Sequence, residues 1–322
     1  MSGKSIQSKP GFMRLIPARF FPGRGRAVSP AAFWRVIPPV LLALAGVGLA
    51  TPATIDPINR YAYGADVGWL NWGGDTNHGA VIGDYVCSGS LYSANAGWIS
   101  LGGGSPANGI QYQNNSAVDF GVNVDRLGNL RGYAYGANIG WIAFENTGAP
   151  QVSLLTGNLS GWVWSANCGW ISLSNAVAQV QTDSIQPGVA APDGLPVAWL
   201  LLNFGSTNVS ANADPTGKGM TVGQDYLAGT DPNNPGSLLR ITQETFFFLP
   251  AGAGTRATFT WDSVPSRYYH LQTTPGLSPS AWTDSGLGLI SPSAGSTSTA
   301  VFTNANAEAQ FYRVEAVRPL TP

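Results

Sequence analysis

"GYAYGANIGWIAF" at residues 132–144 and "GWVWSANCGWISL" at residues 161–173 are two versions of one aromatic-rich phrase. Two more versions, "RYAYGADVGWLNW" at residues 60–72 and "GSLYSANAGWISL" at residues 89–101, complete a set of four. The central Gly/Ser-Ala-Asn/Asp segment is typical of a turn, because Asn and Gly tolerate a positive φ. Since alternating residues flank this segment on both sides, each copy is predicted to form a β-hairpin.

The repeated Trp of each copy lies on the face of its strand opposite the apolar residues that follow it, because successive side chains alternate. These residues are Trp69, Trp98, Trp141 and Trp170. They share their face with Asn71, Ser100, Ala143 and Ser172. The Trp side chains either pack between hairpins or form exposed platforms that stack on sugar rings, with Asn and Ser as hydrogen-bond partners. Because a Gly precedes each Trp and leaves room for a neighbouring strand, we expect at least three of the four to be buried.

The intervals between these Trp residues are 29, 43 and 29, so the copies come as two pairs. A repeat of this length relies on its neighbours to bury its apolar face. We therefore expect one all-β domain over residues 51–180, built as a sandwich or blade-like stack of hairpins. The turn positions Asp66, Asn95, Asn138 and Asn167 are equivalent, so turn geometry explains them better than a catalytic carboxylate.

The N-terminal segment has the composition of a secretory signal. Residues 1–35 contain seven basic residues and no acidic one, and an apolar run follows over residues 36–50. This predicts a signal peptide over residues 1–50 with a long basic n-region, cleaved near Ala50 or Ala53. The run is short and contains two Pro residues, so a permanent membrane span is not expected. We therefore expect a secreted, extracellular or cell-surface protein.

Removal of residues 1–50 leaves nine basic and 17 acidic residues, a net charge of −8, which argues against nucleic-acid binding. An exported chain with two cysteines favours a disulfide between Cys87 and Cys168. The alternative is two buried thiols, because the equivalent positions of the other copies are apolar.

Residues 181–236 are predicted to form a linker with short helices. Its first part is rich in Pro, Gly and Ala, and "GLPVAWLLLNFG" predicts a helix from Pro196 that ends at Gly205. Thr221 and Gln224 have capping-box spacing, and Gly229 stands where a helix C-cap belongs.

Within this linker, "ADPTGKGMTVGQDY" resembles the calcium loops of thrombospondin type 3 and dockerin-like repeats. The resemblance implies Asp214, Thr216, Met220 (through its carbonyl) and Asp225 as calcium ligands. Lys218 instead places an ammonium group at the fifth position of the loop, where an anionic ligand belongs. We therefore expect no cofactor, with calcium at a degenerate loop as the alternative.

The C-terminal residues 237–322 contain alternating strand patterns separated by Gly, Pro and Ser turns, which predict an antiparallel β-sandwich. "WDSVPSRYYHLQTT" and "FYRVEAV" resemble fibronectin type III-like modules, which serve as spacers or adhesion domains. Trp261 and Tyr269 are the expected core anchors. The hairpin repeats resemble the "GYAWGxNIGWI" repeats of secreted bacterial proteins, and this resemblance implies an envelope or extracellular location without pointing to an activity.

Motifs for catalysis are few. The sequence has no G-x-S-x-G and no P-loop. A carboxylate pair for glycoside hydrolysis stays open among Asp75, Asp84, Asp119, Asp125 and Glu145. The leading interpretation is a non-enzymatic structural or adhesive protein that contacts an envelope or extracellular polysaccharide or protein. The alternatives are a glycan-binding module that uses the repeated Trp and, third, a secreted hydrolase.

Overall fold

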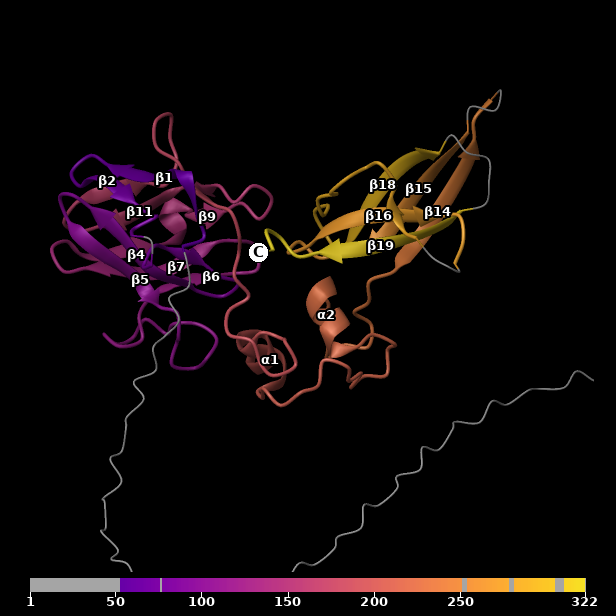
Figure 1. The fold of residues 1–322 in the computed structure, drawn as a ribbon, viewed down its shortest axis with the longest axis horizontal. Coiled ribbons are helices and arrows are strands. Elements are labelled where there is room, and N and C mark those ends of the chain that lie inside the picture. Colours follow the sequence, from indigo (N-terminus) through magenta and orange to yellow (C-terminus); the bar gives the residue numbers. More distant parts are fainter. Residues whose placement is uncertain (1–52, 76, 251–253, 278–280, 305–309, 322) are drawn as a thin grey trace, which may run out of the picture. The chain divides into compact units, whose positions relative to one another are not determined.

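The computed structural model of the protein describes residues 53–75, 77–250, 254–277, 281–304 and 310–321 (Figure 1). These residues are mainly β-strands, with two short α-helices, α1 (Val197–Phe204) and α2 (Val222–Ala228). Within this part of the chain, no helix combines the length and apolar character that a membrane crossing requires. The predicted signal peptide at residues 1–50 lies outside the described residues.

Each copy of the repeated phrase forms an antiparallel hairpin, so this prediction is confirmed. The four hairpins are β1 (Ile55–Gly64) with β2 (Gly68–Asn71), β4 (Cys87–Ser93) with β5 (Gly97–Gly103), β7 (Leu130–Gly136) with β8 (Gly140–Phe144), and β11 (Trp162–Ser165) with β12 (Gly169–Ser172). The second strand of each hairpin begins at a Gly with positive φ, between 66° at Gly169 and 74° at Gly68 and Gly97. The turn therefore requires this Gly, because an L side chain is disfavoured at such a φ.

The hairpins join edge to edge into a closed antiparallel barrel of eight strands. β2 pairs with β4, β5 with β7, and β8 with β11, and β12 returns to pair with β1. The predicted sandwich or blade-like stack of hairpins was wrong. Closure pairs the first strand, β1, with the last, β12, which removes the exposed sheet edges that a stack would leave.

The barrel interior is a packed apolar core. It is formed by the residue after each repeated Trp and the residue two positions further on, none more than 2% exposed: Leu70, Ile99, Ile142, Ile171, Trp72, Leu101, Phe144 and Leu173. The space left among these side chains is about 10 Å³. A single water needs roughly 10–15 Å³. The interior therefore has no room for a ligand.

Asparagine side chains join neighbouring hairpins at the turn end of the barrel. The Nδ2 atom of one turn donates to a carbonyl of the preceding turn: Asn95 to Val67 (3.2 Å), Asn138 to Ala96 (3.2 Å) and Asn167 to Ile139 (3.0 Å). All four turns therefore lie at one end. Asp66 holds the equivalent position of the first hairpin, with its Oδ2 over Gly169. Its carboxylate has no proton to donate, so the closing contact lacks this bond.

Cys87 and Cys168 are both buried and free, so the expected disulfide was wrong. Cys87 begins β4, whose other end leads into a turn, whereas Cys168 lies in the turn between β11 and β12. Because all four turns lie at one end of the barrel, Cys87 and Cys168 are separated by the length of β4, about 20 Å at 3.3 Å per residue. A disulfide needs Cα atoms within roughly 7 Å.

Short strands complete the sheets around the barrel. β3 (Val81–Ile82) pairs with β4, β6 (Val122–Val124) with β7, and β13 (Val180–Thr182) with β1. β9 (Gln151–Val152) and β10 (Leu159–Ser160) form a separate two-stranded sheet, which follows a 3₁₀ turn, η1 (Asn146–Gly148). The pairing of β13 with β1 brings the end of the repeat region beside its beginning.

The two helices begin and end as predicted. α1 starts after Pro196 and ends at Gly205, which has a φ of 64°. α2 has the full capping box, with Thr221 accepting from the backbone N–H of Gln224 and the Gln224 side chain accepting from Thr221, and it ends at Gly229. The caps are local interactions, which explains why the residue types alone predicted them.

The C-terminal strands form two antiparallel sheets of three strands each. One contains β14 (Ile241–Phe248), β15 (Thr255–Asp262) and β18 (Thr297–Asn304), and the other β16 (Tyr268–Thr274), β17 (Thr283–Asp284) and β19 (Phe311–Val317). Trp261 of one sheet and Tyr269 of the other are fully buried in one cluster, with ring centroids 5.7 Å apart. Both are core residues, as predicted.

Candidate functional site

The four repeated Trp side chains are exposed, so the expectation of burial was wrong. Trp69 and Trp98 are 48% exposed, Trp141 46% and Trp170 45%. The preceding Gly supplies the positive φ of the turn, rather than space for a neighbouring strand. The barrel uses only its inner face for the core, and the Trp face points outward.

Each repeated Trp has an aromatic partner directly across its hairpin. The pairs are Tyr63 with Trp69, Tyr92 with Trp98, Tyr135 with Trp141, and Trp164 with Trp170. The ring centroids of the three Tyr–Trp pairs are 5.1, 5.1 and 4.8 Å apart. We call these eight residues the aromatic belt. Each Tyr–Trp pair fixes the orientation of its indole, which reduces the entropy lost when a ligand binds.

The polar residues beside the Trp side chains are engaged with their own backbone. Asn71 accepts from the N–H of Gly73 at 3.0 Å, and Ser100 accepts from the N–H of Gly102 at 3.2 Å. Ser172 is buried and donates to the carbonyl of Ser174. The predicted role of these side chains as hydrogen-bond partners of a sugar is therefore not supported by their geometry.

A groove of about 590 Å³ lies beside Trp69 on the outer surface. Its lining residues are Ile58, Asn59, Tyr61, Trp69, Asn175, Ala176, Val177, Ala178 and Gln179. No local pattern of residues 175–179 indicates this groove, because only the pairing of β13 with β1 brings the segment to the first hairpin. Three other cavities of the described residues are not lined by a repeated Trp.

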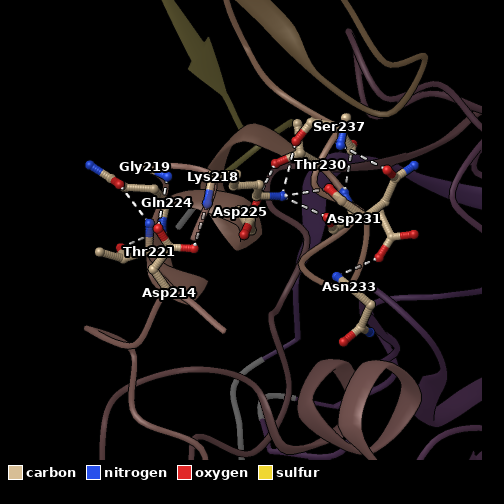
Figure 2. A network of polar contacts seen from close by, with 12 residues as sticks. Asp214, Lys218, Gly219, Thr221, Gln224, Asp225, Thr230, Asp231, Asn233 and Ser237 are labelled. Carbon is tan, nitrogen blue, oxygen red and sulfur yellow. Dashed lines mark hydrogen bonds and ion pairs between the residues drawn. The ribbon is translucent and has the colours of Figure 1, made fainter. Parts of the chain in front are cut away.

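The calcium-loop resemblance leads to a buried ion pair. The Lys218 ammonium lies 2.7 Å from the Asp225 carboxylate, and the two side chains are 1% and 0% exposed (Figure 2). Lys218 also donates to the carbonyls of Asp231 (2.7 Å) and Ser237 (2.9 Å). Thr230 donates to the same carboxylate oxygen of Asp225. The residue at the fifth loop position therefore neutralises the carboxylate that a calcium ion would need.

The other implied ligands serve the loop itself. Asp214 accepts from the backbone N–H groups of Gly219 (2.7 Å) and Lys218 (3.1 Å), and these bonds lower the pKa of its carboxyl group. Thr216 also contributes to the lowered pKa of Asp214, and Met220 is half-buried. The described residues contain no cluster of three His, Cys, Asp or Glu side chains placed to hold a metal.

Three of the five carboxylates considered for hydrolysis have structural roles. Asp119 is 6% exposed and accepts from the backbone N–H groups of Ala107 and Gln113. Asp125 accepts from the N–H of Leu127 within its own turn. Asp75 pairs with His78 at 2.9 Å, and this hydrogen bond lowers the pKa of Asp75. Each of the three holds a loop in place.

The repeated Trp residues and their aromatic partners form an exposed aromatic belt with a groove at its first Trp, and the linker contains a buried ion pair. The belt offers apolar ring faces to a ligand, whereas the ion pair is closed to solvent. Comparison with family models, with curated proteins and with solved structures finds no match to this chain.

Proposed function

We propose that this protein is a non-enzymatic, secreted glycan-binding protein whose ligand stacks on the aromatic belt. The exposure of all four repeated Trp side chains, between 45% and 48%, carries the proposal. Large aromatic groups exposed together usually mark an interaction surface. The face of a pyranose ring presents C–H groups that pack on an indole, while its hydroxyls stay hydrated at the edge of the contact.

The repetition of the belt suits a repetitive ligand. Four hairpins present equivalent platforms around one barrel, so a polysaccharide or a polysaccharide surface can engage more than one of them. A single stacking contact is weak, and several contacts on one polymer raise the apparent affinity without a new kind of interaction. This arrangement also suits an adhesive role at the cell surface.

The remaining parts of the chain have supporting roles in this proposal. Residues 1–50 direct export and are removed, which leaves an acidic protein with no affinity for nucleic acid. The two C-terminal sheets form a fibronectin type III-like sandwich that acts as a spacer. Their shared cluster of buried aromatic residues supports this part of the proposal.

Retention on insoluble polysaccharides tests the proposed function. The wild-type protein is mixed with cellulose, chitin, xylan or mannan, and the unbound fraction is measured. The quadruple variant Trp69→Ala/Trp98→Ala/Trp141→Ala/Trp170→Ala should lose most of the retention. Phe247→Ala is the control, because Phe247 is also an exposed aromatic residue but lies in β14, outside the hairpin repeats.

Two outcomes contradict the proposal. The first is no retention of the wild-type protein on any of the four polysaccharides. The second is equal retention of the wild-type protein and the quadruple variant, which would show that the polymer binds elsewhere. Retention on neutral phosphatidylcholine vesicles, without retention on polysaccharide, would assign the belt to lipid instead.

A further inference from the structure

The groove beside Trp69 exists because the first hairpin departs from the pattern of the other three. The pairing of β1 with β13 shifts register between Ile55 and Arg60, where Asp56 accepts from the backbone N–H groups of Ile58 (2.9 Å) and Asn59 (2.6 Å). This irregularity turns Ile58 outward, to 82% exposure. The equivalent residues of the other copies are all 0% exposed: Cys87, Leu130 and Leu159.

The second wall of the groove is the turn that leads from β12 to β13. The backbone N–H of Asn175 donates to the carbonyl of Ala178 at 2.7 Å, which closes the turn. The N–H of Tyr61 donates to the carbonyl of Gln179 at 3.0 Å, which holds the turn against β1. Both walls are thus fixed by backbone hydrogen bonds, so the groove is preformed.

The lining of the groove is neutral and offers hydrogen bonds. None of its nine residues carries a carboxylate, ammonium or guanidinium group. Asn59 donates from Nδ2 to Gln181 (3.0 Å), and Gln179 donates from Nε2 to Asn158 (2.9 Å). These bonds fix the two amide groups and leave their oxygens to accept from a ligand. A volume of about 590 Å³ lies within the range of roughly 300–1,000 Å³ for small-molecule sites.

We infer that the groove beside Trp69 is a subsite for a short, uncharged oligosaccharide, and that it is the strongest site of the aromatic belt. One sugar ring stacks on Trp69, with Tyr61 at its edge, and its hydroxyls donate to the oxygens of Asn59 and Gln179. This inference rests on the proposed glycan binding. The other three repeated Trp side chains lack this groove and act as flat supports for a longer polymer.

Titration with soluble oligosaccharides tests the inference. The probes are the neutral hexasaccharides of cellulose, chitin, xylan and mannan, with a hexasaccharide of hyaluronan as the anionic comparison. Binding is followed by calorimetry and by tryptophan fluorescence. The wild-type protein should bind at least one neutral probe with one site per chain and should not bind the anionic one. Trp69→Ala should weaken binding by about ten-fold or more, because it removes the stacking platform.

A second variant separates a binding role from a loss of folding. Gln179→Leu removes the amide but keeps the approximate size of the side chain, and it leaves Trp69 in place. This variant should lower the affinity for neutral oligosaccharides by about three- to ten-fold. Trp98→Ala should change hexasaccharide affinity by less than two-fold while it reduces retention on the polymer. Phe247→Ala, in β14 and outside the hairpin repeats, is the control that should change neither. Thermal melting verifies that every variant is folded.

The outcomes distinguish this inference from the proposed function. If polysaccharide retains the protein but Trp98→Ala weakens the hexasaccharide as much as Trp69→Ala does, the special role of the groove is refuted and the glycan-binding function stands. The same holds if Gln179→Leu has no effect, or if the hyaluronan probe binds as well as the neutral ones. If no polysaccharide retains the wild-type protein, both ideas fail together.

Discussion

The ammonium group of Lys218 lies 2.7 Å from the carboxylate of Asp225, and neither side chain is more than 1% exposed. A charge this deeply buried is tolerated only with its partner and with hydrogen bonds to the remaining atoms. The carbonyls of Asp231 and Ser237 supply those bonds to the ammonium, and Thr230 donates to Asp225 Oδ1, whereas Asp225 Oδ2 is buried without a partner. The Lys218 ammonium group therefore holds the linker around α2 together.

Replacement of Lys218 by Met should destabilise the linker by about 3–5 kcal/mol, because it leaves the Asp225 carboxylate buried and unpaired. Native-state hydrogen exchange of the α2 amides measures this loss. The double variant Lys218→Met/Asp225→Leu should recover most of it. Arg240→Gln is the control, since the pair of Arg240 with Asp262 is partly exposed and should cost less than about 1 kcal/mol. Equal effects of Lys218→Met and Arg240→Gln would contradict the role of the buried pair.

Calcium should not change the melting temperature of the wild-type protein, because Lys218 already neutralises Asp225. Replacement of Lys218 by Asn frees this carboxylate and supplies an oxygen ligand at the fifth loop position. We expect the Lys218→Asn variant to melt at a higher temperature with calcium than with a chelator. Differential scanning calorimetry measures both proteins. A calcium-dependent increase in the wild-type protein would show that other oxygens complete a site.

The closing contact of the barrel offers a stabilising change. Asn95, Asn138 and Asn167 each donate to the preceding turn, whereas Asp66 faces the fourth turn with a carboxylate. Asp66→Asn should add the missing bond to the carbonyl of Cys168 and stabilise the barrel by about 0.5–1.5 kcal/mol. Urea denaturation measures the change. Asn138→Asp is the reverse control and should destabilise, so a loss of stability in Asp66→Asn would be the contradicting result.

The two faces of the first hairpin should respond differently to Trp→Ala substitution. Trp69 is 48% exposed and Trp72 is 2% exposed. Trp69→Ala should cost about 0.5–1.5 kcal/mol, the scale of its contact with Tyr63. Trp72→Ala should cost about 3–5 kcal/mol, because it leaves a cavity in the core. Urea denaturation of both variants provides the comparison, and a large loss in Trp69→Ala would mean that the belt is structural.

Burial raises the pKa of the Cys87 thiol to about 12, from a reference value of 9.0. The neutral thiol is the form that the folded barrel favours. The contribution of Cys87 to stability is therefore complete below pH 9 and is lost as the pH rises toward 12. Cys87→Val should flatten this alkaline decline in denaturation experiments. Thiol titration of the native protein at pH 8 should leave Cys87 unmodified, and rapid modification would contradict its burial.

Local patterns predicted the parts of the fold that depend on nearby residues. Period-two alternation around a turn segment identified the hairpins and their apolar faces, and cap residues such as Thr221 and Gly229 identified α2. The closure of the barrel depends on β12 pairing with β1, for example Tyr63 with Ser172, and no local pattern reports that contact.

The candidate site was predicted only in part for the same reason. The repeated Trp residues were identified as a binding surface in one of two interpretations, but the Gly before each Trp was assigned to packing instead of turn geometry. The three turn Asn residues were correctly assigned to the turn, while their bonds to the preceding hairpin went unrecognised. The groove could not be predicted, because Gln179 reaches Tyr61 only through the pairing of β13 with β1.

In a closed ring of hairpins, the structure does not fix which hairpin comes first in the chain. Because β12 contacts β1 as any hairpin contacts the next, the covalent order of the hairpins is in principle cyclically permutable. New termini fit best between the second and third copies, at residues 102–131, where the connection is already longer than between the other copies. Addition of a hairpin is less readily tolerated than permutation of the four. A fifth hairpin would give ten strands and a wider barrel, whose interior the present side chains could no longer fill.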